Sequence, residues 1–173
     1  YAETGQVQQK VFGSSVETQQ YSYNISGQLT GINSGYVTTP NAGNAYFGES
    51  LSYAHGFTNN QYNGGIAGVQ WKTGGDNIQR AYGYAYDNAG RLTKADFVQQ
   101  NTGSTAWTTD KVDYTVSGLT YDAGGNILSM TQKGLLTGSN ATIDSLAYTY
   151  FANSNRLQKI GDLATAGGGL GDF

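Results

Sequence analysis

Y-A-Y-D-N-A-G-R-L-T-K-A-D-F, the stretch Tyr84–Phe97, decides the fold of this chain. Tyrosine alternates with small residues here, and a β-strand places alternate side chains on the same face of a sheet. The pattern therefore predicts a strand that presents Tyr82, Tyr84 and Tyr86 on one face.

The residues after this strand predict a tight turn. Asp suits the first position of a turn, and Gly tolerates the left-handed backbone conformation that closes a type I turn with a bulge. With Asn88–Gly90 as the loop, Asp87 faces Arg91 across the two strands, and Tyr86 faces Leu92 on the opposite side of the sheet. The stretch is thus predicted to form a β-hairpin.

The same motif recurs along the chain, and this repetition is the strongest signal in the sequence. Its core is Tyr-[Asp/Asn/Ala]-x-x-Gly-[Gln/Arg/Asn]-[Leu/Ile/Val], with Tyr at position one, Gly at position five and the aliphatic residue at position seven. The connections between copies vary in length. Clear copies begin at Tyr1, Tyr23, Tyr86 and Tyr121, and weak copies begin at Tyr62 and Tyr150.

Together with the near absence of helical periodicity, the repeats predict an all-β fold. We expect successive antiparallel β-hairpins over residues 1–163, and a Gly-rich tail or linker over 164–173. Strands are also expected at Gln8–Phe12, Ser50–Phe57 and Gly65–Lys72. The segments Trp107–Thr115 and Leu119–Thr131 lead into the copy at Tyr121, and Ser145–Tyr150 and Arg156–Gly161 flank the weak copy at Tyr150. Polar loops or insertions are expected at Asn33–Glu49, Gln99–Ala106 and Leu135–Ile143.

Composition favours an extracellular setting. Charged residues make up only 12% of the 173 residues, well below the roughly 25% of a typical soluble domain. The chain has 26 Gly, 14 Tyr and a single Pro, Pro40. A nearly neutral, tyrosine-rich surface is typical of an all-β secreted or cell-surface protein, and we expect that location.

Charge and cysteine usage exclude several classes of partner and chemistry. The net charge is −3 and no run of Lys or Arg occurs, so neither nucleic acid nor an anionic membrane is expected as a partner. No apolar run approaches the roughly 18 residues of a membrane span. The absence of Cys removes disulfides, thiolate catalysis and zinc–sulfur sites. Because the chain begins at Tyr1 within a copy of the motif, we expect it to be a piece of a longer protein.

The motif resembles the tyrosine–aspartate (YD) repeat of the rearrangement-hotspot (Rhs) family. Y-A-Y-D-N-A-G-R-L (Tyr84–Leu92) matches its signature, and L-T-Y-D-A-G-G-N-I-L (Leu119–Leu128) is similar. Y-S-Y-N-I-S-G-Q-L-T (Tyr21–Thr30) and G-G-I-A-G-V-Q-W-K-T (Gly64–Thr73) resemble segments of long YD-repeat proteins from bacterial surfaces. The resemblance covers most of the chain.

The resemblance implies a structural role rather than an enzymatic one. In that family successive hairpins form one continuous sheet that winds in a spiral, so the resemblance implies a curved, spiralling open sheet over residues 1–163. The family's sheet forms a hollow β-shell that encloses a toxin or effector domain lying outside the repeats, and teneurin ectodomains use a similar shell. The family's end-of-shell segment with its Asp-Pro motifs is absent, because the only Pro is Pro40. A piece of 173 residues is too short to close a shell, so further repeats or a protein partner are expected to cover its sheet edges and apolar face.

Candidate catalytic residues are few. His55 is the only His, and although Ser50 and Ser52 are near it, no G-x-S-x-G elbow is present. Asp87 and Asp122 could pair as general acid and base. Their recurrence at position two of the motif instead favours a role as turn-formers.

Aromatic residues supply the candidates for ligand binding. A strand face lined with flat rings can stack against sugar rings, although the same rings also stabilise a sheet through cross-strand pairs, which we consider the stronger interpretation. The candidates are Tyr82, Tyr84, Tyr86, Tyr114, Tyr121, Tyr148, Tyr150, Trp71 and Trp107.

We therefore predict no catalytic, cofactor-binding or metal-binding residues, and Gly167–Asp172 is interpreted as a flexible linker rather than a calcium-binding repeat. The predicted function is that of a structural segment of a secreted or surface YD-repeat protein, whose shell encloses or presents an effector. The alternative is a surface adhesion module that binds carbohydrate or protein through its Tyr and Trp faces. A hydrolase centred on His55 is the weakest hypothesis.

Overall fold

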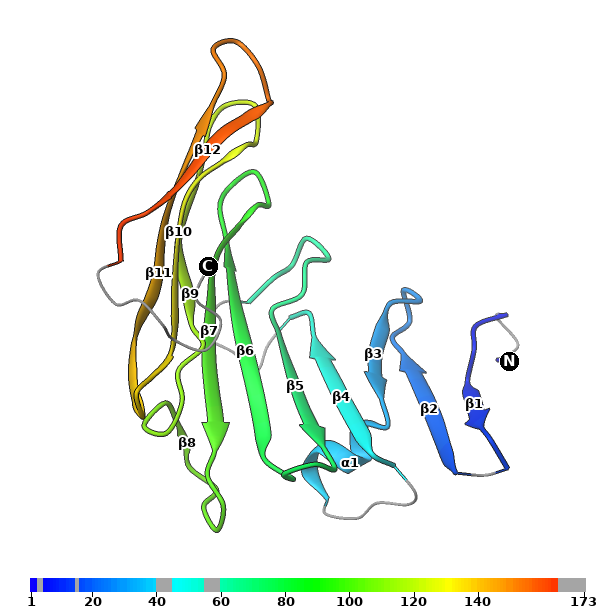
Figure 1. Ribbon diagram of the computed structural model, residues 1–173. Coiled ribbons are helices and arrows are strands. Elements are labelled where there is room, and N and C mark those ends of the chain that lie inside the picture. Colours follow the sequence, from blue (N-terminus) through cyan, green and yellow to red (C-terminus); the bar gives the residue numbers. More distant parts are fainter. Residues whose placement is uncertain (3–4, 15, 40–44, 55–59, 165–173) are drawn as a thin grey trace. The chain divides into compact units, whose positions relative to one another are not determined.

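The computed structural model describes residues 1–2, 5–14, 16–39, 45–54 and 60–164. Its strands are antiparallel, and their order in the sheet is β1-β2-β3-β4-β5-β6-β7-β9-β10-β11-β12, with β8 paired to β7 (Figure 1). The order follows the sequence, as expected for hairpin after hairpin. The all-β, antiparallel fold class is confirmed.

The chain divides into two compact units, each described by itself. The first comprises Tyr1–Tyr82 and Gln99–Ala106. Its elements are β1 (Gln9–Phe12), β2 (Glu17–Tyr23), β3 (Leu29–Ile32), α1 (Ser34–Thr38), β4 (Phe47–Ser52), β5 (Gly68–Thr73) and the first half of β6 (Gln79–Tyr86).

The second unit comprises Gly83–Val98 and Trp107–Phe173. It holds the second half of β6 and most of β7. The strands of this unit after β6 are β7 (Leu92–Gln100), β8 (Trp107–Thr108), β9 (Val116–Tyr121), β10 (Ile127–Leu136), β11 (Ser139–Tyr150) and β12 (Leu157–Asp162).

The strand registers confirm the predicted pairing across the turns. Tyr23 lies opposite Leu29 in the β2–β3 hairpin, and Tyr121 lies opposite Ile127 in the β9–β10 hairpin. In each case position one of the motif faces position seven. The motif therefore sets the register of the hairpin that contains it.

Each unit buries its own apolar residues. In the first unit α1 lies against β4, where Gly48 allows the approach, because a Cβ at this position would lie 2.8 Å from the Asn33 carbonyl oxygen. In the second unit the side chain of Ile143 lies over Gly134, where an added Cβ would lie 2.6 Å from Ile143 Cδ1. The buried apolar residues are Tyr36, Val37, Ala67, Val69 and Ala81 in the first unit, and Ala95, Phe97, Leu119, Ile143 and Leu146 in the second.

The expectation that Asn33–Glu49 is a loop was wrong at both ends. Asn33 adopts the left-handed conformation with φ of 44°, and α1 follows directly. Tyr36 and Val37 on this one-turn helix are buried. β4 then begins at Phe47. A single turn of helix is too short to produce a recognisable helical period, and its stability comes from the packing of these two side chains.

The expectation that Leu135–Ile143 is a loop was also wrong. β10 and β11 pair through it, with Leu136 opposite Ser139. Thr137 and Gly138 connect them with φ of 46° and 85°, and two successive positive φ values are typical of a type I′ hairpin turn. The polar composition concealed the strands, since Thr-Gly is a weaker hairpin signal than Asn-Gly.

Other expected boundaries shift by a few residues. Within the segment Trp107–Thr115 only Trp107–Thr108 is a strand, and β7 extends into the expected insertion as far as Gln100. β5 begins at Gly68 rather than Gly65. β4 ends at Ser52, and positions 55–57 of the expected strand lie outside the described residues, as does 165–173 of the expected tail.

The assignment of a type I′ turn between β10 and β11 can be tested by two substitutions. Thr137→Asn should raise the free energy of unfolding by about 0.5–1 kcal/mol, because Asn tolerates the left-handed conformation better than a β-branched residue. Gly138→Ala should lower it by about 1 kcal/mol, because its φ is positive. Urea unfolding of the two variants measures both. Equal, near-zero effects would contradict a type I′ turn at this site.

Candidate functional site

The turn of the motif is held by the side chain at position two. Asp87 Oδ1 accepts hydrogen bonds from the backbone N–H groups of Ala89 and Arg91, both at 2.9 Å. Its Oδ2 accepts one from Arg91 Nε at 2.7 Å, and Gly90 adopts φ of 77°. The predicted pairing of Asp87 with Arg91 is therefore confirmed.

Other copies repeat this chemistry with different residue types. Asn24 Oδ1 accepts from the backbone N–H groups of Ser26 and Gln28, both at 3.0 Å. Asp122 Oδ1 accepts from the Asn126 N–H at 2.8 Å. Since an amide and a carboxylate both serve, the turn needs an acceptor oxygen at position two rather than a charge.

The electrostatics of the two aspartates argue against a general acid. The N–H of Arg91 is the main cause that lowers the pKa of Asp87, and the Asn126 side chain is the main cause that lowers the pKa of Asp122. A general acid working near neutral pH needs a raised pKa. Both carboxylates are committed to stabilising their turns.

The degenerate copy after Tyr150 replaces Gly with Asn. Asn153 adopts φ of 55°, and the turn is closed by a hydrogen bond of 3.0 Å from the Phe151 N–H to the Arg156 carbonyl. Asn is the residue other than Gly that tolerates this conformation best. The turn therefore survives the loss of Gly.

A second set of contacts joins several copies to the copy before them. Tyr121 Oη donates to the Leu92 carbonyl at 2.6 Å, so position one of one copy binds position seven of the preceding copy. We call this contact the tyrosine link. The same link joins Tyr23 Oη to the Val7 carbonyl at 2.9 Å and Tyr150 Oη to the Ile127 carbonyl at 2.8 Å.

The side chain at position six also joins two copies, but it contacts the following copy rather than the preceding one. We call this contact the position-six link. Arg91 Nη1 donates to the Asp122 carbonyl at 3.1 Å, and the Arg91 guanidinium lies 4.7 Å from the centre of the Tyr121 ring. The other position-six links are Gln6 Nε2 to the Gly27 carbonyl at 2.9 Å, Gln28 Nε2 to the Gly64 carbonyl at 3.2 Å, and Asn126 Nδ2 to Asn155 Oδ1 at 2.9 Å.

One residue of this network was missed by sequence reasoning. Tyr53 donates its hydroxyl to the Leu29 carbonyl at 2.9 Å, whereas the sequence pattern placed the start of this weak copy at Tyr62. Tyr62 is 83% exposed, and its hydroxyl accepts from Asn60 Nδ2. An insertion separates Tyr53 from the rest of its copy, so spacing alone gave no signal for it.

The remaining catalytic candidates do not form a site in the described part of the chain. His55 lies outside the described residues, while Ser50 and Ser52 belong to β4. Within the described ranges no three His, Asp or Glu residues gather as metal ligands. No described helix is long and apolar enough to cross a membrane.

The aromatic candidates are largely engaged within the sheet. Trp71 stacks on Tyr82 with ring centres 5.5 Å apart, and Tyr114 contacts the edge of Phe97 at 5.2 Å. Tyr121 and Tyr150 form the links described above. Trp107 differs, since it is 38% exposed.

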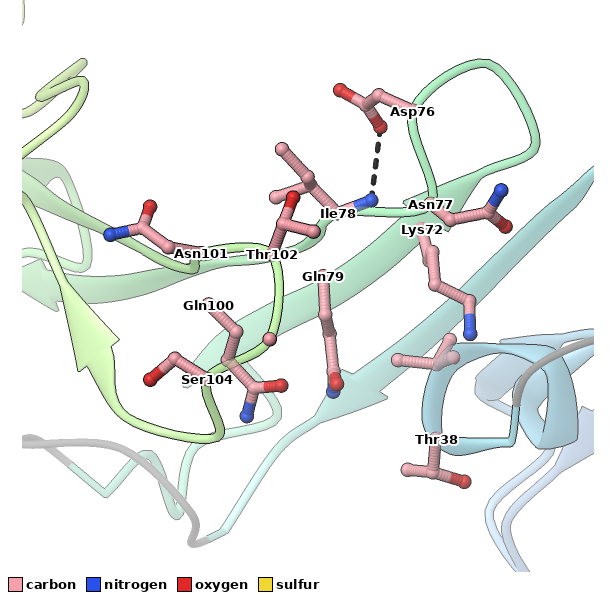
Figure 2. Close-up of a pocket in the computed structure, with 12 residues that line it drawn as sticks. Thr38, Lys72, Asp76, Asn77, Ile78, Gln79, Gln100, Asn101, Thr102 and Ser104 are labelled. Atoms are coloured by element: carbon pink, nitrogen blue, oxygen red, sulfur yellow. Dashed lines mark hydrogen bonds between the residues drawn. The ribbon is translucent and has the colours of Figure 1, made fainter.

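The first unit also contains a polar pocket of about 260 Å³. Figure 2 shows Thr38 and Lys72 on one side and Gln100 and Ser104 on the other, with the Gln79 side chain between them. Apart from Lys72, Asp76 and two apolar residues, the lining carries only amides, hydroxyls and one Gly. The lining is Val37, Thr38, Lys72, Asp76, Asn77, Ile78, Gln79, Gln100, Asn101, Thr102, Gly103 and Ser104.

Lys72 is the unusual member of this lining. It is only 5% exposed, and burial lowers its pKa. Its Nζ lies 4.7 Å from the centre of the Tyr36 ring and 3.5 Å from the Thr39 carbonyl oxygen. Sequence reasoning did not identify Lys72, because its contacts come from Tyr36 and Thr39, which lie far from it in the sequence.

No family model matches the chain, and no curated protein matches it.

The tyrosine link can be tested by removing one oxygen atom. Tyr121→Phe should lower the free energy of unfolding by about 1 kcal/mol, because the ring stays and only the hydrogen bond to the Leu92 carbonyl is lost. Tyr46→Phe is the matched control, since Tyr46 is 61% exposed and should change stability little. Urea unfolding gives both values. Equal losses in the two variants would contradict the link.

The turn acceptor can be tested in the copy that carries Asn. Asn24→Ala should lower the free energy of unfolding by about 1 kcal/mol, because two backbone N–H groups lose their acceptor. Asn24→Asp should be tolerated, because Asp87 and Asp122 perform the same task in other copies. Thermal unfolding at pH 7 compares the variants. If Asp proved as damaging as Ala, the acceptor account would be wrong.

Proposed function

We propose that this chain is a structural segment of a secreted or cell-surface YD-repeat protein of the Rhs type, whose β-shell encloses or presents an effector or toxin domain. The observation that supports this proposal is that neighbouring copies of the motif are joined by the tyrosine links and the position-six links. Tyrosine at position one and the polar residue at position six join hairpin to hairpin, so these recurring residues of the motif serve to hold the sheet together. Repeated residues that join neighbouring hairpins are what a scaffold requires, whereas in an enzyme we would expect the repeated positions to carry reacting groups.

The ends of the strand order support the expected partners. β1 and β12 stand at the two ends of that order, and Val11 and Phe12 of β1 are 55% and 46% exposed. On β12, Leu157 and Ile160 are 43% and 46% exposed. Edge strands with exposed apolar side chains need a cover. Further repeats of the same design would supply it, with the Leu157 carbonyl as the position-seven acceptor for a following tyrosine.

A second candidate function is an adhesion module that binds carbohydrate or another surface protein through exposed rings. Trp107 favours it, because this ring is 38% exposed and available to stack on a sugar. The engagement of Trp71 with Tyr82 leaves fewer free rings than the sequence suggested. The scaffold therefore remains our first proposal.

Protease protection tests the scaffold. Antibodies against this chain would recover the native protein from the surface and secreted fractions of its source cells. We expect the recovered protein to contain a segment outside the repeats that resists protease while the repeats are folded. The same segment should be digested once the repeats are unfolded. Introducing Tyr121→Phe with Tyr150→Phe should make that segment easier to digest.

Two results would contradict the proposal. One is a protein confined to the cytosol, and the other is a recovered protein without any protected segment. Quenching of tryptophan fluorescence by polysaccharides, abolished by Trp107→Ala, would favour the adhesion module instead.

A further inference from the structure

The pocket beside α1 contains a positive charge that no carboxylate in the described part of the chain balances. Lys72 is 5% exposed, and within the described residues none of the ion pairs involves it. A buried ammonium is costly unless it is paired. Its contacts are the Tyr36 ring face and one carbonyl oxygen at 3.5 Å, which is a long hydrogen bond for a group with three N–H donors.

The rest of the pocket is suited to hydroxyl groups. Asn77, Gln79, Gln100, Thr102 and Ser104 line it. Each of the three amides uses one of its two polar atoms within the protein: Asn77 Oδ1 accepts from the Tyr36 hydroxyl, Gln79 Nε2 donates to Gln70 Oε1, and Gln100 Nε2 donates to the Thr105 carbonyl. Amides and hydroxyls both donate and accept hydrogen bonds, which is what a polyol requires of its surroundings. These groups come from the β5–β6 connection, β6 and the segment that follows β7, so the backbone of the first unit places them around a common space.

The lining also contains the carboxylate of Asp76, but its charge is already balanced by Arg80, so it does not repel an anion bound at Lys72. Asp76 pairs with Arg80, with Oδ2 2.6 Å from Nη2, and its Oδ1 accepts from the Ile78 N–H at 3.0 Å (Figure 2). Its side chain is 42% exposed, which places it at the rim. Arg80 is the main cause that lowers the pKa of Asp76, so this carboxylate already has its countercharge.

We propose that this pocket binds a sugar acid, a saccharide unit carrying a carboxylate, with the carboxylate at Lys72 and the ring hydroxyls at the amide and hydroxyl wall. The volume of about 260 Å³ lies just below the range of roughly 300–1,000 Å³ for small-molecule sites, which suits a single sugar unit. A nucleotide would need more cations than one lysine. The site contains none of the Trp side chains of the adhesion hypothesis, and it does not depend on the shell proposal.

The test is an NMR titration of the ¹⁵N-labelled 173-residue chain with D-glucuronate, with D-glucose and acetate as matched probes. We expect saturable shifts in the amides of Thr38, Asn77 and Gln100–Ser104 with glucuronate. Glucose and acetate should each bind at least about tenfold more weakly, because each lacks one half of the recognised chemistry.

Lys72→Met removes the charge while keeping an unbranched side chain, and it should weaken glucuronate binding by about tenfold or more. Lys94→Met is the matched control, since Lys94 is a half-exposed lysine paired with Asp96, and it should bind as the unaltered chain does. If Lys72→Met does not fold, the comparison of the three probes on the unaltered chain still decides. Absence of saturable shifts, equal binding of glucose and glucuronate, or unchanged binding by a folded Lys72→Met variant would overturn the proposal.

Discussion

The hydrogen bond from a tyrosine hydroxyl to a carbonyl of the preceding copy is the contact on which the repeats depend. Tyr121 and Tyr150 each span from the strand before their own turn to position seven of the preceding copy. A phenylalanine would fill the same space but would leave the carbonyl without this donor. A shorter hydroxyl side chain would not carry its oxygen beyond the backbone of its own strand. Tyrosine at position one is thus set by distance and by hydrogen bonding together.

The turn makes this contact reproducible from copy to copy. An acceptor oxygen at position two and a left-handed residue near position five fix the path of the backbone, so position six always leaves the turn in the same direction. Arg91 and Gln28 can then reach the following copy although they differ in charge and length. The described residues of the connections between hairpins carry none of these contacts, and the connections vary in length. Tyr53 shows how far this tolerance goes, because it keeps its link with an insertion inside its own copy.

Contacts between residues close together in the sequence could be predicted, whereas contacts between distant residues could not. The turn at Asp87 and Arg91 was predicted in detail, since both partners lie within one short motif whose residue types have direct conformational meaning. The tyrosine links were not predicted, because Tyr121 and Leu92 are far apart in sequence and nothing in the local pattern specifies the partner. Lys72 was missed for the same reason, as its surroundings combine α1 with distant turns. The short helix α1 and the Thr137–Gly138 turn were missed because their local signals are weak.

Hydrogen exchange in the Tyr121→Phe variant tests the central claim most directly, that links between copies hold the hairpins together. The Arg91 N–H lies in the turn before the link, and the Asn126 N–H lies in the turn after it. If the link couples the two copies, both amides should exchange faster in the variant than in the unaltered chain, because either turn opens more readily once the other is released. Faster exchange at Asn126 alone, with Arg91 unchanged, would show that each hairpin is stable by itself and would contradict the account.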